Sequence, residues 1–122
     1  MNSKKINKSE YMVNDKKYEF MNYTKYNRNG FNHNSTLYVN GMYLGESNIH
    51  YVNRTWESFK YQTSMLEVIN SIIDELYITS KNNFKQQYNI KRLSGKNKEL
   101  FENQFNDKLF IQELKELKKL LK

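Results

Sequence analysis

The C-terminal half of the chain carries the hydrophobic period of an α-helix. Apolar side chains recur there at intervals of three and four residues, which places them along one face of a helix. This stripe consists of Met65, Leu66, Ile69, Ile72, Ile73, Leu76 and Tyr77. The sequence offers two alternative starts for this helix. Ser64 with Glu67 has the spacing of a capping box, whereas Thr55 can cap an earlier start that turns Trp56 inward.

Two shorter helices are expected beyond this stripe. Residues 79–93 are rich in Asn, Gln and Lys, which suits either a loop or a fraying extension of the long helix. Ser94-Gly95 then offers a new start, so we expect a short helix over about 96–105. Asn106 can cap a last helix. The wide apolar face of that helix consists of Leu109, Phe110, Ile111, Leu114, Leu117, Leu120 and Leu121.

The N-terminal half has β-type residues broken by turn signals. Three runs, roughly 16–26, 31–39 and 42–51, are separated by Asn27-Arg28-Asn29-Gly30 and by Asn40-Gly41. Asn-Gly between two β-prone runs is a strong hairpin signal. The pattern therefore predicts an antiparallel β-meander.

The alternation within the first of these runs leaves apolar side chains on both faces. Tyr18, Phe20 and Tyr26 fall on one face of the strand, and Met21 and Tyr23 fall on the other. A second face covered by a helix, a ligand or another subunit explains this pattern.

The order of elements defines the expected fold class. Strands come first and helices second, which predicts an α+β fold with an N-terminal antiparallel meander, a long helix and C-terminal helices packed on the sheet. Residues 1–15 are expected to form a polar arm or an edge strand. Residues 16–122 form one domain, with the sheet at about 16–56 and the helices at about 57–121.

Charge and composition narrow the class of function. The net charge is +7, from 20 Lys and Arg against 13 Asp and Glu, and such a surplus attracts phosphate-bearing or other anionic partners. A low-GC genome enriches Lys and Asn without selection for charge, but it does not explain the three arginines in the same way. The chain has no Cys, and we expect a cytoplasmic protein that is neither exported nor membrane-spanning.

The sequence contains none of the common motifs in which catalytic or metal-binding residues recur at fixed spacings. There is no Gly-rich phosphate loop, no His-based metal motif and no Gly-x-Ser-x-Gly elbow, so we expect no enzyme, no metal and no cofactor. His33 and His50 fall on neighbouring strands, where surface or hydrogen-bonded roles are expected. Asp74 and Glu75 are adjacent on the long helix and are expected to be solvated.

A ligand site is predicted around Arg54 and Trp56. On an extended strand they share a face, where Arg offers a bidentate fork for phosphate and Trp a stacking platform for a base. The alternative is that Trp56 anchors the core and that Arg54 pairs with Glu57.

Two further regions are candidates for the same site. Arg92 lies beside Lys91 and close in sequence to Phe84, Tyr88 and Asn89, as a second wall of the pocket or as part of a solvated basic loop. Arg28 occupies the tip of the first predicted hairpin, where it can reach a partner.

The meander with Asn40-Gly41, followed by Tyr51-Val52-Asn53-Arg54-Thr55-Trp56-Glu57-Ser58-Phe59-Lys60-Tyr61-Gln62 and a long helix, resembles small phage and prophage proteins of low-GC Gram-positive bacteria. In its size and its sheet-then-helices order the chain is most similar to the phage anti-Thoeris sponge family, also named Thoeris anti-defence protein one. The resemblance covers roughly residues 16–80.

This resemblance implies a homo-oligomer in the cytoplasm of an infected bacterium that captures a cyclic ADP-ribose isomer without cleaving it, which blocks Thoeris immunity. It also implies aromatic residues against the adenine, at Trp56 or Phe84. The residues implied at the pyrophosphate and in the pocket wall are Arg54, Arg92, Arg28 and Asn89.

Two other functions stay open on the sequence. One is a phage inhibitor that binds a host defence protein, in the manner of an anti-CRISPR protein. The other is a basic nucleic-acid binder with an aromatic β-surface, although no recognition helix, zinc finger or RNP-like pattern is present and nucleic acid is not the expected partner.

Overall fold

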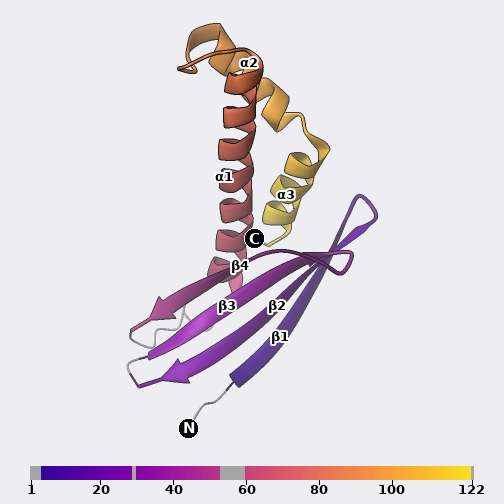
Figure 1. Ribbon diagram of the computed structural model, residues 1–122. Coiled ribbons are helices and arrows are strands. Elements are labelled where there is room, and N and C mark those ends of the chain that lie inside the picture. The colour runs from indigo at the N-terminus through magenta and orange to yellow at the C-terminus, as the bar shows by residue number, and fades with distance from the viewer. Residues whose placement is uncertain (1–3, 29, 53–59, 122) are drawn as a thin grey trace.

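The computed structural model describes residues 4–28, 30–52 and 60–121. A four-stranded antiparallel sheet forms the N-terminal half, and three helices follow it (Figure 1). The predicted α+β class, with strands first and helices second, is confirmed.

The sheet is a meander in which each strand pairs with the next. Its spatial order is β1-β2-β3-β4, and all neighbours are antiparallel. The strands are β1 (Lys4–Val13), β2 (Lys16–Asn27), β3 (Gly30–Val39) and β4 (Met42–Tyr51). The three predicted runs are confirmed, and of the two alternatives for the N-terminal residues the edge strand is correct. The expected extension of the sheet to about residue 56 lies outside the described residues beyond Val52.

Two hairpins close through residues with positive φ. Asn40 and Gly41 have φ of 48° and 82°, and Asn14 and Asp15 have φ of 49° and 64°. Consecutive left-handed residues give the turn whose twist matches the right-handed twist of the strands. The side chain of Asn40 also accepts a hydrogen bond of 2.9 Å from the backbone N–H of Lys17. The Asn40-Gly41 turn was predicted, whereas the Asn14-Asp15 turn was not.

The long helix α1 (Gln62–Gln87) begins between the two predicted signals, after Thr55 and two residues before Ser64. Lys60 and Tyr61 precede it, so the expected start near residue 57 is wrong, and Thr55 lies outside the described residues. Ser64 is not a cap, because its buried hydroxyl lies 2.6 Å from the Ser35 hydroxyl and donates to the Tyr61 carbonyl at 2.9 Å. A contact with the sheet therefore takes the place of the predicted capping box.

The two C-terminal helices are α2 (Gly95–Asn106) and α3 (Leu109–Leu120). Residues 79–87 are helical, so for them the predicted extension of α1 is correct. Asn106 is the last residue of α2 rather than the cap of α3, and Lys108 holds the cap position. The Asn106 side chain instead accepts a hydrogen bond of 2.9 Å from the Lys115 ammonium group.

The helices cover one face of the sheet and extend beyond it. Helices α1 and α3 contact the strands, and α2 packs on α1 and α3 at the end remote from the sheet (Figure 1). The core accordingly has two parts. The sheet core lies between the strands, α1 and α3, and contains Tyr18, Phe20, Leu37, Ile69, Leu114 and Leu117. The distal core lies among the helices and contains Phe84, Phe101, Phe105 and Ile111.

The two faces of β2 differ as predicted. Tyr18 and Phe20 are fully buried beneath the helices and Tyr26 is half-buried, while Met21 and Tyr23 are exposed on the opposite face. Among the described elements, no helix covers that opposite face.

A buried carboxylate ties α3 to the first hairpin. The Glu113 side chain has no exposed surface, and its carboxylate accepts hydrogen bonds from the Lys16 ammonium at 2.9 Å, the Tyr18 hydroxyl at 2.9 Å and the Asn14 amide at 3.3 Å. A buried charge is tolerated only when it is paired and hydrogen-bonded. These three donors therefore allow Glu113 to remain ionised inside the protein.

The pKa of Glu113 shows which effect dominates. Burial by itself raises the pKa of this carboxyl, but hydrogen bonds from Lys16, Tyr18 and Asn14 outweigh burial, and the net pKa is lowered. A carboxyl with a lowered pKa in the folded state stabilises the fold above its unfolded-state pKa, and this stabilisation is lost as the pH falls through the folded-state pKa.

Replacement of this carboxylate tests its role. Glu113→Gln is expected to lower the free energy of unfolding by about 2 kcal/mol at neutral pH, because charge-assisted hydrogen bonds are removed inside the protein. Glu116→Gln, exposed on the same helix, is the matched control and is expected to change it by less than about 0.5 kcal/mol. Urea unfolding followed by circular dichroism measures both. The difference between Glu113→Gln and wild type should shrink below about pH 4, and equal effects of the two variants would contradict the assignment.

Candidate functional site: the basic tip

Charged side chains are segregated along α1. Residues 62–75 carry Glu67, Asp74 and Glu75 with no Lys or Arg, and residues 76–87 carry Lys81 and Lys85 with no acidic residue. Acids near the N-terminus and bases near the C-terminus of a helix both interact favourably with its dipole. The helix therefore separates an acidic region near the sheet from a basic region far from it.

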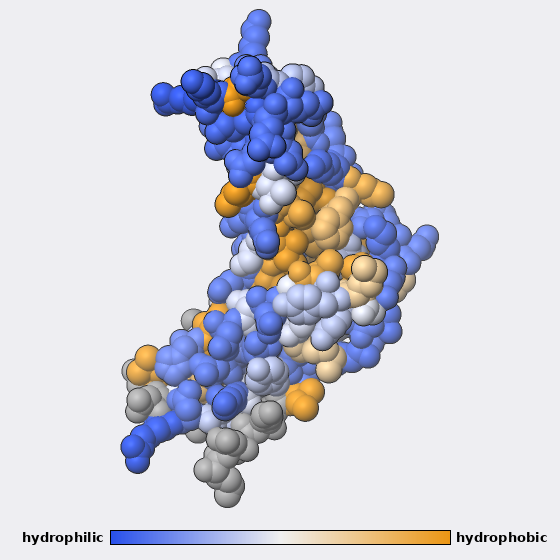
Figure 2. Space-filling view, in the orientation of Figure 1, coloured by the Kyte–Doolittle hydropathy of each residue, from blue (hydrophilic) through white to orange (hydrophobic). Residues whose placement is uncertain are grey.

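The basic region continues through the connection into α2. Residues 76–98 contain no Asp or Glu, and the six cations among them are Lys81, Lys85, Lys91, Arg92, Lys96 and Lys98. We call residues 81–98 the basic tip. Figure 2 shows that hydrophilic side chains cover this end of the helices, whereas apolar side chains gather in the middle of the molecule.

The cations of the basic tip are open to solvent. Four of them are exposed, namely Lys91, Arg92, Lys96 and Lys98, while Lys81 and Lys85 on α1 are half-buried. Within the part of the chain that the structure describes, the ion pairs join other residues, and none involves these six. Their charge is therefore free to act on a partner.

The end of α1 shapes the basic tip. The Ile90 N–H donates to the Lys85 carbonyl at 2.8 Å, and the Asn89 N–H donates to the Gln86 carbonyl at 3.3 Å. With Asn89 left-handed at φ 53°, these bonds form a Schellman motif. Ile90 packs on the distal core that contains Phe84, which is the hydrophobic contact typical of this motif. Asn89, predicted as a ligand residue, thus has a structural role in ending the helix.

The two aromatic residues of the basic tip have different roles. Phe84, expected to stack on a ligand, is only 6% exposed and packs against Phe101 with ring centroids 5.4 Å apart. Because α2 covers it, Phe84 belongs to the distal core. Tyr88 is 50% exposed and rests on Phe84 at 4.7 Å. Sequence reasoning named Tyr88 only as a neighbour of Arg92, since the pattern did not show which ring α2 covers.

A hollow on the basic tip is lined by amide groups. Its walls are Asn82, Lys85, Gln86, Asn89 and Ile90. Three amide side chains and one ammonium group therefore face a shared space, where they can donate and accept hydrogen bonds.

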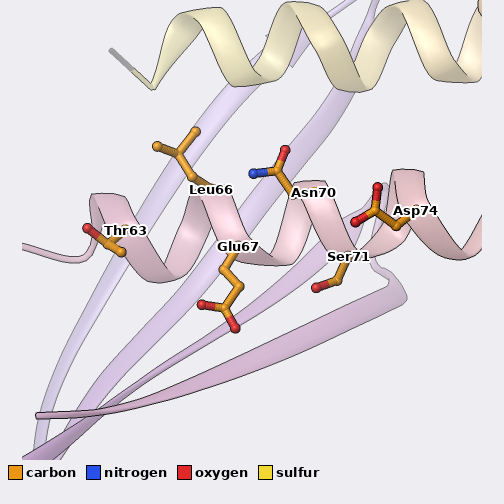
Figure 3. Close-up of a pocket in the computed structure, with 6 residues that line it drawn as sticks. All are labelled: Thr63, Leu66, Glu67, Asn70, Ser71 and Asp74. Carbon is orange, nitrogen blue, oxygen red and sulfur yellow. The ribbon is translucent and has the colours of Figure 1, made fainter.

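A second hollow lies along the first half of α1 (Figure 3). All six of its wall residues come from that one helix, and Leu66 and Asn70 point toward α3. The full set is Thr63, Leu66, Glu67, Asn70, Ser71 and Asp74. Its two carboxylates have no Lys or Arg beside them on this half of the helix, so the hollow repels phosphate.

Arg28 lies at the opposite end of the molecule, beside a cluster of aromatic rings. It is exposed in the turn after β2. The stacked rings of Phe31 and Tyr51 lie 5.2 Å apart, and His33 contacts Tyr51 at 5.3 Å and Tyr61 at 4.6 Å. These rings, with Tyr26, form the aromatic cluster at this end of the sheet.

His33 is fixed by hydrogen bonds within the aromatic cluster. Its Nδ1 lies 2.9 Å from the Thr24 hydroxyl, which lies 2.6 Å from the Tyr61 hydroxyl. His33 is buried on the inner face of the sheet, whereas His50 is exposed and bonds Asn32 at 2.6 Å. The two histidines therefore face opposite sides of the sheet and form no acid–base pair. The exposed Asp74 and Glu75 are solvated as predicted.

Arg54 and Trp56, the centre of the predicted site, lie outside the described residues. Tyr51 precedes them in the sequence and Tyr61 follows them, and both tyrosines contact His33.

Two of the predicted arginines, Arg28 and Arg92, do not meet in one chain. Arg28 lies at the end of the sheet from which α1 begins, and Arg92 lies beyond the other end of α1 (Figure 1). A helix of 26 residues is about 39 Å long. Arg28 and Arg92 therefore cannot close around one nucleotide within a single copy.

A row of polar side chains crosses the inner face of the sheet between the sheet core and the aromatic cluster. Asn7, Asn22, Ser35 and Ser47 are paired in register across the four strands. The Ser35 hydroxyl bonds Ser64 of α1. The side-chain Oδ1 of Asn22 and the Ser47 hydroxyl have no hydrogen-bond partner among the described residues. Sequence reasoning missed this row because each of its members lies on a different strand, and three turns separate the four strands in the sequence.

The described residues contain neither a metal-binding cluster nor a membrane-spanning helix. No group of three or more His, Cys, Asp or Glu side chains is arranged to hold a metal ion within residues 4–28, 30–52 and 60–121. None of the helices described is both long and apolar enough to cross a membrane.

Comparisons with known proteins give no match. No family model matches the chain, and neither the curated proteins nor the solved structures contain a match to it.

The structural role of Asn89 can be tested by substitution. Asn89→Ala is expected to lower the free energy of unfolding by about 1 kcal/mol, because a left-handed residue with a Cβ is strained. Asn89→Gly should leave it unchanged within about 0.5 kcal/mol, since glycine adopts this conformation freely. Asn83→Ala, exposed within α1, is the control and should not destabilise. Urea unfolding measures all three, and a neutral Asn89→Ala would refute the role in the Schellman motif.

Proposed function

We propose that this protein binds a phosphate-bearing polyanion through the basic tip and does not transform it. The observation that carries the proposal is the acid-free run of residues 76–98, whose six cations gather at one end of the molecule. A local excess of positive charge attracts polyanions and releases their counterions on binding.

The open shape of the basic tip supports an extended ligand. Small ligands bind in pockets that enclose most of their surface, whereas Lys91, Arg92, Lys96 and Lys98 project from an exposed end. Lysine ammonium groups act as point charges on separate phosphates. A chain of phosphates can engage several of them at once, which a single nucleotide cannot.

The distribution of charge also favours the basic tip, rather than the uncovered face of the sheet, as the surface that binds phosphate. On that face Lys8 pairs with Glu10 at 2.9 Å and Glu19 at 3.2 Å, and Lys17 pairs with Glu19 at 3.1 Å. The side-chain hydrogen bonds of these pairs raise the pKa of Lys8 and lower that of Glu19. These four charges cancel, so the sheet face attracts phosphate less than the tip does.

Substitution of three tip cations tests the proposal. The triple variant Lys91→Gln, Arg92→Gln, Lys96→Gln is expected to weaken binding of a fluorescent oligonucleotide at least tenfold. It should also make the slope of log K against log salt shallower by about 0.7 to 0.9 for each phosphate that the variant no longer neutralises. Fluorescence polarisation over a series of salt concentrations measures affinity and slope together.

A matched control separates the site from net charge. The variant Lys115→Gln, Lys118→Gln, Lys119→Gln removes the same number of charges from α3. It is expected to bind within about twofold of wild type, because salt screens these distant charges from the ligand and every cation of the tip is kept. Equal reductions of affinity in the two triple variants, or no binding of nucleic acid by the wild type, would refute the proposal.

The aromatic cluster favours a second candidate, the capture of a nucleotide immune signal such as a cyclic ADP-ribose isomer. The half-buried Tyr51, which stacks on the buried Phe31, offers an edge for a base, and the exposed Arg28 offers a contact for a phosphate. Because Arg28 and Arg92 lie far apart in one chain, a site that uses both requires a homo-oligomer that brings two copies together. This second candidate implies a role in the infected cell as an anti-defence protein that sequesters the signal.

Retention of intact ligand tests this second candidate. The protein is incubated with cyclic ADP-ribose isomers, filtered and heated, and the released molecules are analysed by mass spectrometry. Capture predicts release of unaltered ligand by the wild type and by the α3 triple variant at Lys115, Lys118 and Lys119, and at least tenfold less by Arg28→Ala. No retained ligand eliminates capture, and altered ligand shows an enzyme instead.

A further inference from the structure

We infer that the basic tip binds single-stranded nucleic acid and that Tyr88 is the residue on which a base stacks. This inference rests on the proposed binding of a polyanion at the tip. It specifies that the ligand is single-stranded, and it names a residue that recognises a base, which net charge alone cannot do.

The ring of Tyr88 is supported on one side and open on the other. It lies 4.7 Å from the Phe84 ring at an interplanar angle of 49°, and Phe84 is held in the distal core by Phe101. Tyr88 is nevertheless 50% exposed. A ring fixed from behind by the core loses little conformational freedom when a base stacks on its open side.

Cations flank this ring along the same face of α1. Lys81, Lys85 and Tyr88 follow one another at intervals of four and three residues, which places them on one side of a helix. Their Cα atoms rise by about 6 Å and then about 4.5 Å along the axis. Both lysines are half-buried, so their stems are supported by neighbouring residues.

The amide hollow adjoins the ring through Lys85. Lys85 belongs both to the face that carries Tyr88 and to the hollow with Asn82, Gln86 and Asn89. Amide groups donate and accept hydrogen bonds in the pattern that base edges require. A stacked base and a hydrogen-bonded base edge are both accessible only when the base is unpaired. This combination therefore favours a single strand over a duplex.

Tyr43, an exposed tyrosine elsewhere on the molecule, lacks this combination of neighbours. Tyr43 is 56% exposed, but its hydroxyl donates to the Glu46 carboxylate at 3.3 Å, and Glu75 lines the same hollow. These carboxylates repel a phosphate backbone. Tyr43 is therefore a suitable control, being an exposed tyrosine in an acidic setting.

The test compares Tyr88→Ala, Tyr88→Phe and Tyr43→Ala for binding to labelled single-stranded DNA, single-stranded RNA and duplex DNA by fluorescence polarisation. Tyr88→Ala is expected to weaken single-strand binding by about ten- to hundredfold, the range of one base–aromatic stack. Tyr88→Phe keeps the ring and should bind like wild type, as should Tyr43→Ala. The salt slope should be the same in all three variants, because each keeps every cation of the tip.

The outcomes separate this inference from the function on which it rests. If the triple tip variant loses binding while Tyr88→Ala binds single strands like wild type, stacking is refuted and polyanion binding stands. If the wild type binds none of the three probes, both are refuted. Urea unfolding of Tyr88→Ala at the assay temperature verifies that this variant is folded. Tyr88→Phe, which removes only the hydroxyl, shows whether the ring itself is what the ligand requires.

Discussion

The buried carboxylate of Glu113 is the interaction on which the arrangement of the helices depends. It holds α3 to the β1–β2 hairpin through Lys16 and Tyr18. Helix α3 in turn joins the two parts of the core, because Leu114 and Leu117 enter the sheet core and Ile111 enters the distal core. The carboxylate thus adds a specific polar anchor to the apolar packing of Leu114 and Leu117 on the sheet. A buried charged group therefore helps to fix where α3 lies on a largely apolar assembly.

That arrangement separates two chemically different ends. The sheet end holds the aromatic cluster and Arg28, and the far end holds the basic tip. Between them the first half of α1 is acidic, which disfavours spread of a polyanion from the tip toward the sheet. The distal core supports the tip from beneath, since Phe84 carries both the Tyr88 ring and Ile90 of the Schellman motif. Binding at the tip therefore requires no rearrangement of the sheet.

Local patterns predicted the fold well, and distant contacts account for what they missed. The Asn40-Gly41 turn and the helical stripe of α1 are properties of neighbouring residues, and both were predicted. The three partners of Glu113 lie 95 to 99 residues away in sequence, so no local pattern marks it. The region around Arg92 was predicted as a candidate, but the packing of α2 decides that Phe84 is buried and Tyr88 is open. Arg54 and Trp56 lie outside the described residues, and their predicted role stays a prediction.

The most direct test of a phosphate-binding tip is a residue-by-residue map of the ligand contact in solution. Amide chemical shifts of the ¹⁵N-labelled protein are followed by NMR during titration with a single-stranded oligonucleotide. If the tip binds phosphate, the largest changes fall in residues 81–98 and the strands β1 to β4 change little. The largest changes on the sheet, with residues 81–98 unaffected, would contradict the account and place the binding surface elsewhere.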